Sequence, residues 1–207
     1  MKTFVFIDAS NLFYGGEKSL GWKIDYQKLF QYLKEKYNAE NVFYFGGVEI
    51  HNFPYNYQIE ETVPIVDLEK HLLALLKDAR LNEADIVLIG RHLQRVRFYL
   101  KLKQFGYHLF LKPVKMYEQE DGTTKRKANC DVDMAFHLMK EKDNFDNLIA
   151  LSGDGDFLPV FKYLKSQNKE VIILARGART AREIRQFAGS NFRDFTRLES
   201  RLKFEEK

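Results

Sequence analysis

The fold is decided by the stretch Leu148-Ile149-Ala150-Leu151-Ser152-Gly153-Asp154-Gly155-Asp156-Phe157, in which four apolar residues precede two aspartates set among glycines. A short apolar run bounded by turn residues is typical of a buried strand, and the residues that follow it, 157–167, have helical spacing. Strands that alternate with helices in this way indicate a parallel α/β sheet. Ligands of such sheets bind beyond the carboxyl ends of the strands, which is where Asp154 and Asp156 stand.

Two further groups of acids occupy comparable positions in the sequence. Asp8 ends the apolar run of residues 3–7, with Asn11 one turn later, and Asp131 opens the amphipathic stretch 131–142. Carboxylates collected at one edge of a sheet repel one another unless a cation lies between them, so the pattern predicts a divalent-metal site. Asp131 is the preferred ligand of its group. Asp133, two positions on, diverges from it on a regular helix and is expected to cap the helix or pair with a base.

Each of these polar residues also has a local structural explanation. Asp8 can form an Asx turn or cap the next segment, and Asp156 can cap a helix that begins at Phe157. Capping explains one of the acids Asp154 and Asp156 but not both. The Ser152 hydroxyl can donate to a phosphate or to a metal-bound water, or it can satisfy the local backbone.

The remaining pattern predicts one domain over residues 1–200, with an insertion at about 50–90 and a charged end at 201–207. Residues 51–63 are expected to form a loop. Residues 85–90 fit either a strand or the start of the next helix, and the helix is preferred. Residues 112–127 are expected to form an exposed strand pair or a loop, with a turn at Asp121-Gly122. The expected strands are 3–7, 41–46, 107–111, 148–151, 171–175 and 192–195, and the expected helices are 24–37, 66–80, 92–105, 131–142, 157–167 and 180–188.

Composition excludes several classes of protein. With 207 residues, 45% of them hydrophobic, the chain is long and apolar enough for a folded core. No apolar run approaches the roughly 20 residues of a membrane span, so no membrane partner is expected. A single cysteine excludes an internal disulfide framework and suits a cytoplasmic protein, and with the scattered histidines it gives no zinc spacing.

Positive charge is concentrated in one segment. Residues 91–127 contain ten Lys or Arg against three acids, whereas the whole chain has a net charge of only +4. Such a segment beside an acidic site suits a polyanion held by its phosphates, although a solvated basic surface is an equal alternative. Lys127 lies just before Asp131. A second basic set recurs every three residues, as along one helical flank: Arg176, Arg179, Arg182 and Arg185.

Aromatic residues near the first acid are a further candidate feature. Phe13, Tyr14 and Trp22 follow Asp8 closely enough to stack on a nucleic-acid base, although most aromatic residues in such a chain form the core.

Three motifs in this order resemble a known family. They are Phe6-Ile7-Asp8-Ala9-Ser10-Asn11, Lys127-x-x-Cys130-Asp131-Val132-Asp133 and Ser152-Gly153-Asp154-Gly155-Asp156-Phe157. Their order and spacing resemble the NYN domain, the LabA-like branch of the PIN-like nucleases, over nearly the whole chain. The resemblance implies a three-layer, PIN-like Rossmannoid fold with a mainly parallel sheet, and acids that bind Mg²⁺ or Mn²⁺ and cleave RNA. Mapped onto this chain, those acids are Asp8, Asp131, Asp154 and Asp156, with Asn11 as their polar companion.

The resulting hypothesis is metal-dependent hydrolysis of single-stranded RNA. Asp8, Asp131, Asp154 and Asp156 would hold one or two Mg²⁺ or Mn²⁺ ions. Asn11 and Ser152 would orient the phosphate, and Lys127 and Arg176 would offset its charge. Nothing in the sequence indicates a reader of the 2′-hydroxyl, so DNA stays an alternative substrate, and a homo-oligomer is left open.

Two other functions are weighed against hydrolysis of RNA. One is a non-catalytic RNA- or protein-binding module in which the acids hold a structural ion. The other is an aspartyl-phosphate phosphatase with Asp8 as nucleophile. Phosphatases of that kind resemble one another in a second acid two positions later, where this chain has Ser10, which counts against that reading.

Overall fold

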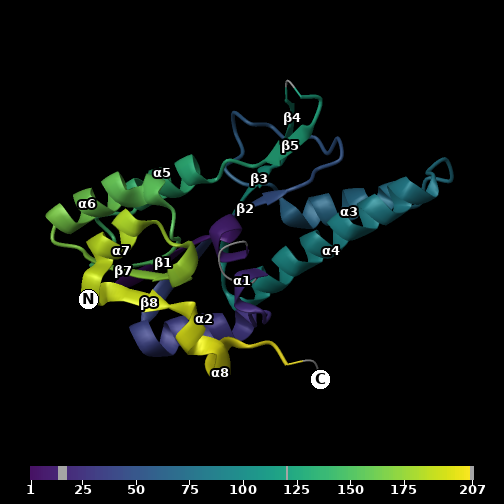
Figure 1. The fold of residues 1–207 in the computed structure, drawn as a ribbon. Helices are drawn as coiled ribbons and strands as arrows, with labels where there is room; N and C mark the ends of the chain where they lie inside the picture. Colours follow the sequence, from purple (N-terminus) through teal and green to yellow (C-terminus); the bar gives the residue numbers. More distant parts are fainter. Residues whose placement is uncertain (14–17, 120, 206–207) are drawn as a thin grey trace.

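The computed structural model describes residues 1–13, 18–119 and 121–205, and its centre is a six-stranded parallel sheet (Figure 1). The strand order is β3-β2-β1-β6-β7-β8, and every neighbouring pair is parallel. The predicted α/β class with a mainly parallel sheet is therefore confirmed. The strands are β1 (Thr3–Asp8), β2 (Ala39–Val48), β3 (His108–Pro113), β6 (Asn147–Leu151), β7 (Glu170–Ala175) and β8 (Phe192–Asp194).

Alternation along the strands gives the sheet two apolar faces and the domain three layers. On β1, Val5 and Ile7 belong to one buried cluster, whereas Phe4 and Phe6 belong to another. Successive side chains of a strand point to opposite faces, so a strand that is apolar throughout must be covered on both sides. The first cluster contains residues of α2 (Tyr26–Tyr37), α3 (Ile65–Leu75) and α4 (Glu83–Phe105). The second contains residues of α5 (Asp131–Lys140), α6 (Leu158–Ser166) and α7 (Arg182–Ala188).

The helices largely follow the predicted ranges, with differences at their ends. They are α1 (Lys18–Leu20), α2 (Tyr26–Tyr37), α3 (Ile65–Leu75), α4 (Glu83–Phe105), α5 (Asp131–Lys140), α6 (Leu158–Ser166), α7 (Arg182–Ala188) and α8 (Glu199–Leu202). Residues 85–90 are helical as expected, because they form the start of α4 behind the capping side chain of Asn82. The helix expected over 66–80 ends at Leu75 instead.

A small antiparallel hairpin stands apart from the main sheet. Its strands, β4 (Lys115–Glu118) and β5 (Thr124–Lys127), are exposed throughout and joined by a turn in which Gly122 has a φ of 76°. The predicted strand pair with a turn at Asp121-Gly122 is confirmed. The hairpin leads directly into α5, whose first residue is Asp131 (Figure 1).

The topology places a crevice at the centre of this edge. From β1 the chain proceeds outward through β2 and β3 on one side, and then through β6, β7 and β8 on the other. The reversal between β1 and β6 is a topological switch point, where ligands of open α/β sheets bind. Asp8 is the last residue of β1, and Ser152 directly follows β6.

The proposed boundaries at 50–90 and 201–207 stay predictions. Residues 51–64 contain no helix or strand, and α3 packs through Leu68 and Leu72 into the core. Leu202 is fully buried near the C-terminus, where its carbonyl oxygen accepts a hydrogen bond of 2.7 Å from the Asp25 N–H. In the part of the chain that the structure describes, no helix has the length and apolar character to cross a membrane.

The start of α2 provides a test of the fold. The Asp25 carboxylate accepts hydrogen bonds from the N–H groups of Gln27 and Lys28, at 2.9 and 3.0 Å. We expect Asp25→Ala to lower the free energy of unfolding by about 1 kcal/mol, because two helix N–H groups lose their acceptor. Asp25→Asn retains the cap and should match wild type. Urea denaturation checks both, and equal losses in the two variants would contradict the capping role.

Candidate functional site

The Asp8 carboxylate is the most constrained group at the carboxyl edge of the sheet. Only 5% of the residue is exposed. Its Oδ1 accepts hydrogen bonds of 3.0 Å from the N–H groups of both Ser10 and Asn11, and its Oδ2 accepts one of 3.1 Å from the Ser152 hydroxyl. The Asx turn predicted for Asp8 is therefore present, and the same carboxylate also joins the end of β1 to the end of β6.

Burial governs the acidity of Asp8. Its pKa is raised to about 6. Burial is the main cause and the nearby Asp131 contributes in the same direction, whereas the hydrogen bonds from Asn11, Ser152 and Ser10 act to lower the pKa. Burial outweighs these hydrogen bonds. Asp8 therefore has a strongly perturbed acidity at a ligand-binding edge, which is typical of functional carboxylates.

The loop after β6 is fixed by contacts that need a glycine. The Gly153 N–H donates to the Asn11 side-chain oxygen at 3.0 Å, and a Cβ on Gly153 would lie 2.9 Å from the Cα of Thr180. Asp154 then caps the short turn that follows, by accepting a 3.0 Å hydrogen bond from the Asp156 N–H. The expectation that Asp156 caps the next helix is wrong, because α6 begins at Leu158 without a side-chain cap.

The two acids of α5 separate as the helical spacing predicts. Asp131 is the first residue of the helix, and Asp133 forms an ion pair of 2.6 Å with Lys112. Burial raises the pKa of Asp131, and Asp154 and Asp156 raise it further, whereas Lys127 lowers it. Asp131 is therefore electrostatically coupled to the acids of the β6 loop.

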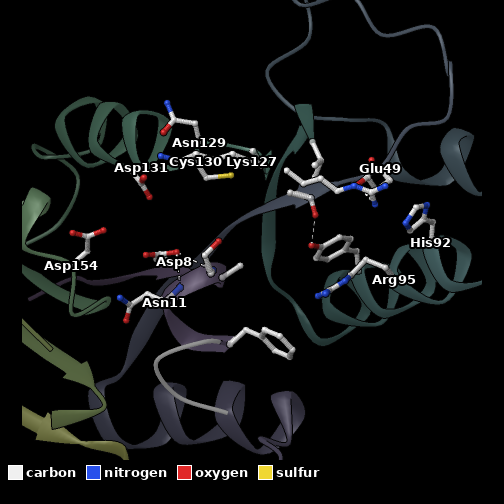
Figure 2. Close-up of a pocket in the computed structure, with 18 of the residues that line it drawn as sticks. Asp8, Asn11, Glu49, His92, Arg95, Lys127, Asn129, Cys130, Asp131 and Asp154 are labelled. Atoms are coloured by element: carbon white, nitrogen blue, oxygen red, sulfur yellow. Dashed lines mark hydrogen bonds and ion pairs between the residues drawn. The ribbon is translucent and has the colours of Figure 1, made fainter. Parts of the chain in front are cut away.

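A cleft of about 830 Å³ collects most of these groups, and we call it the acid cleft. Figure 2 shows that the carboxylates of Asp8, Asp131 and Asp154 face one another across one end of it. Asn11 and Lys127 also line the cleft. Asp156 is exposed and is not part of this lining, so its influence on Asp131 is exerted from outside the cleft.

The donor set fits a hydrated divalent cation. Within residues 1–13, 18–119 and 121–205, no three acid, histidine or cysteine side chains converge closely enough to form a complete metal cage. Mg²⁺ does not need one, because it keeps several waters and is usually bound through one or two carboxylates. Carboxylates that raise one another's pKa across an open cleft suit such an ion, since its charge would relieve their repulsion.

Two of the predicted substrate-binding residues lie away from the cleft. Ser152 is fully buried, where its hydroxyl donates to Asp8 and accepts from the Asp154 N–H at 3.2 Å. Arg176 precedes a 3₁₀ turn, and its Nε donates to the Ser19 hydroxyl at 3.2 Å. Only Arg182 and Arg185 of the predicted arginine flank are in α7, and Arg179 is the arginine of that set that lines the cleft.

The opposite wall of the cleft comes from residues of α4 and the hairpin that belong to the basic segment 91–127, which the sequence pattern placed beside the acidic site. The pattern did not identify which residues of α4 face the cleft. Arg91, His92 and Arg95 of α4 line it, together with Arg126. A signal was present, because Arg91, Arg95 and Tyr99 are four residues apart and so share one helical face. Tyr99 anchors that face by donating a hydrogen bond of 2.7 Å to the Gly47 carbonyl oxygen.

The aromatic residues that follow Asp8 in the sequence lie in different environments. Phe13 lines the cleft, and the Arg95 guanidinium lies 5.7 Å from the centre of its ring. Trp22 is buried in the core, so the idea that it stacks on a base is wrong. Tyr14 lies outside the described residues.

Two other reactive groups in the cleft are held in their neutral forms. Burial raises the pKa of the Cys130 thiol to about 12, so it is not a nucleophile at neutral pH. Burial lowers the pKa of His92, and the charges of Arg126 and Arg95 lower it further. The charge of the cleft at neutral pH is therefore set by its acids and its Lys and Arg residues.

The raised pKa of Asp8 predicts a pH-dependent stability. Between pH 4 and 6 the folded state keeps a proton that the unfolded state releases, so stability should fall as pH rises through that window. We expect Asp8→Asn in EDTA to be about 1–3 kcal/mol more stable than wild type at pH 7 and equal to it near pH 4. Urea denaturation across this range checks this, and a variant less stable at every pH would contradict it.

Comparisons with known proteins identify the family of this chain. The family model described as "NYN domain" matches residues 48–199. The chain is 21% identical over 185 residues to the low amplitude and bright protein LabA of Synechococcus elongatus, which covers 87% of this chain and 77% of LabA.

Among solved structures, a protein of unknown function from Vibrio parahaemolyticus superposes with a TM-score of 0.61 at 17% identity. The match covers 93% of this chain and 91% of that protein, which shows a shared fold. The bacteriophage T5 D15 protein gives a TM-score of 0.45 at 14% identity over 89% of this chain and 59% of its own, which is too low to support an argument about function. The family match spans well over half of the sequence, and the chain therefore belongs to the NYN domain family.

Proposed function

We propose that this protein is a metal-dependent ribonuclease that hydrolyses phosphodiester bonds of single-stranded RNA in the acid cleft. The observation that carries the proposal is the convergence of Asp8, Asp131 and Asp154, from three separate elements, at one end of a cleft whose other wall is cationic. Carboxylates suit a hard divalent cation, and cations suit phosphates. The NYN resemblance supports RNA as the polyanion.

Asp8, Asp131 and Asp154 would hold the Mg²⁺ or Mn²⁺ ion, with Asp156 as an outer member of the set. The bound ion would supply Lewis-acid stabilisation of phosphate charge and would acidify a water molecule for attack. Ser10, Asn11 and Ser152 would keep the Asp8 carboxylate in one orientation, so that little reorganisation is needed when the ion binds. Ser152 thus acts through Asp8 in this proposal and does not touch the substrate.

The cationic wall would bind the substrate backbone. Arg91, Arg95, Arg126 and Lys127 line the cleft, and Glu49 offsets one of them through a 3.5 Å ion pair with Arg126. Arg179 lines the cleft beside the acids, so it replaces Arg176 as the proposed partner of the reacting phosphate. Such contacts are sequence-independent, so binding would weaken steeply with salt.

A second candidate is a non-catalytic RNA- or protein-binding module with a structural ion. The observation that favours it is the cationic wall of the cleft, which would bind a polyanion whether or not the bound strand is cleaved. The nuclease would cleave RNA in the presence of metal, whereas the binding module would bind RNA or protein without cleaving it.

Asp154→Asn provides the direct test of catalysis. We expect it to reduce Mg²⁺- or Mn²⁺-dependent cleavage of labelled single-stranded RNA by at least ~100-fold, because one acid of the proposed set loses its charge. The matched control is Asp143→Asn, a fully exposed acid whose loss should leave the rate unchanged. Single-stranded DNA of the same sequence, tested in parallel, shows whether the protein distinguishes RNA from DNA by the ribose 2′-hydroxyl.

Two outcomes would refute the nuclease proposal. One is cleavage that persists at the same rate in EDTA or in Asp154→Asn. The other is tight binding of RNA by wild type with no metal-dependent product, which would favour the non-catalytic module.

Metal binding should also be visible in stability. An ion that binds only the folded state raises its stability by mass action. We expect millimolar Mn²⁺ to raise the melting temperature of wild type and of Asp143→Asn, and to have little effect on Asp8→Asn or Asp131→Asn. An equal rise in all four proteins would show that the ion binds elsewhere.

A further inference from the structure

A second cavity lies directly beside the acid cleft. Its volume is about 420 Å³, and Ala128 and Asn129 line both cavities. These residues form a thin partition that lies against β2, because a Cβ on Gly47 would come within 2.6 Å of the Cβ of Ala128. The acid cleft and the second cavity are therefore neighbours that meet at these two residues.

The second cavity is rich in aromatic side chains, several of them exposed. Tyr55, Tyr57, Tyr117 and Phe136 line it, and Tyr57, Tyr117 and Phe136 are between 51% and 59% exposed. Such rings offer flat faces on which nucleic-acid bases stack, and stacking tolerates any base because every base has a π face. We call this cavity the tyrosine pocket.

Tyr55 and Tyr57 of the tyrosine pocket are held in place by contacts within their own loop. The Tyr55 hydroxyl donates to the Glu60 carbonyl oxygen at 2.7 Å, and the Asn56 N–H donates to the Glu60 carboxylate at 2.8 Å. The ring of Tyr57 packs edge-on against that of Tyr55, with centroids 4.8 Å apart. Because the rings are ordered in advance, a ligand would lose less conformational entropy on binding to them.

The acids that line the tyrosine pocket all have partners. Glu60 binds its own loop, Glu61 pairs with Lys140 at 3.3 Å, and Asp133 pairs with Lys112 at 2.6 Å. Lys115 is the remaining cation of the lining, and its Nζ lies 5.2 Å from the centre of the Tyr57 ring. The pocket therefore suits flat, uncharged groups with a phosphate near its rim.

The hairpin serves both cavities. Lys115 and Tyr117, two positions apart on β4, line the tyrosine pocket, whereas Arg126 of β5 lines the acid cleft. Lys125 is opposite Tyr117 in the hairpin, so cations flank the rings. Cations beside aromatic rings match a single strand of nucleic acid, in which bases project from a backbone of charged phosphates.

We propose that the tyrosine pocket binds bases of a single-stranded RNA whose reacting phosphate lies in the acid cleft. This inference rests on the proposed nuclease function and extends it, because it assigns a base-binding subsite next to the reacting bond and makes single-strandedness the basis of selection. Paired bases in a duplex have no free face to offer the rings.

The test compares binding with and without the rings. The probe is a labelled single-stranded RNA of about ten nucleotides, and a matched strand without bases is the second probe. In EDTA, the double variant Tyr57→Ala/Tyr117→Ala should bind the RNA at least about tenfold more weakly than wild type by fluorescence anisotropy, and should bind the base-free strand equally well. Tyr57→Phe/Tyr117→Phe keeps the rings and should bind like wild type.

Tyr163→Ala is the matched control, because Tyr163 is 41% exposed and lines neither cavity, and it should leave RNA binding unchanged. Unchanged affinity in the double alanine variant, or an equal loss with the base-free strand, would overturn the proposal.

A kinetic arm separates this proposal from the nuclease proposal. With Mn²⁺, the double alanine variant should show a raised KM for the longer RNA and an unchanged kcat/KM for a dinucleotide too short to reach the pocket. If wild type binds RNA through the tyrosines but does not cleave it, the nuclease proposal is refuted and the base-binding proposal is supported. If wild type and the double alanine variant cleave the longer RNA with the same KM, the nuclease proposal is supported and the base-binding proposal is refuted.

Discussion

The candidate site is organised around a carboxylate that is buried at the end of a central strand. Asp8 is held by two backbone N–H groups and by the Ser152 hydroxyl, and these contacts tie β1 to β6 at the point where the strand order reverses. Burial raises its pKa to about 6, which is an energetic cost to the fold at neutral pH. A cation bound in front of Asp8 would offset that cost, so the same interaction links stability to function.

The cleft has one wall from the sheet edge and one from elements added around it. The acids lie at the ends of β1 and β6 and at the start of α5, positions set by the topology of the sheet. The cations come from the long helix α4 and from the β4–β5 hairpin. The acidic wall is suited to binding a metal ion. The cationic wall and the tyrosine pocket are suited to binding and selecting the nucleic-acid substrate.

Local patterns predicted most of the fold, because strand runs such as residues 148–151 and turns such as the Asx turn of Asp8 act over a few residues. The same logic brought Asp8, Asp131 and Asp154 together, since the ends of parallel strands share an edge. It failed where long-range contacts decide. The Ser152 hydroxyl donates to Asp8, and the Arg176 side chain donates to Ser19, each partner being more than 140 residues away in the sequence. The rings of Tyr57 and Tyr117 are 60 residues apart in the sequence, and only the tertiary fold brings them to one pocket.

The central claim is that carboxylates from three elements share one hydrated divalent cation. The most direct test is the anomalous difference map of a crystal soaked in Mn²⁺. We expect a peak in the acid cleft, within coordination distance of at least one oxygen of Asp8, Asp131 or Asp154, with water as the remaining ligands. A cleft without a peak, with Asp8 still held only by Ser10, Asn11 and Ser152, would contradict it.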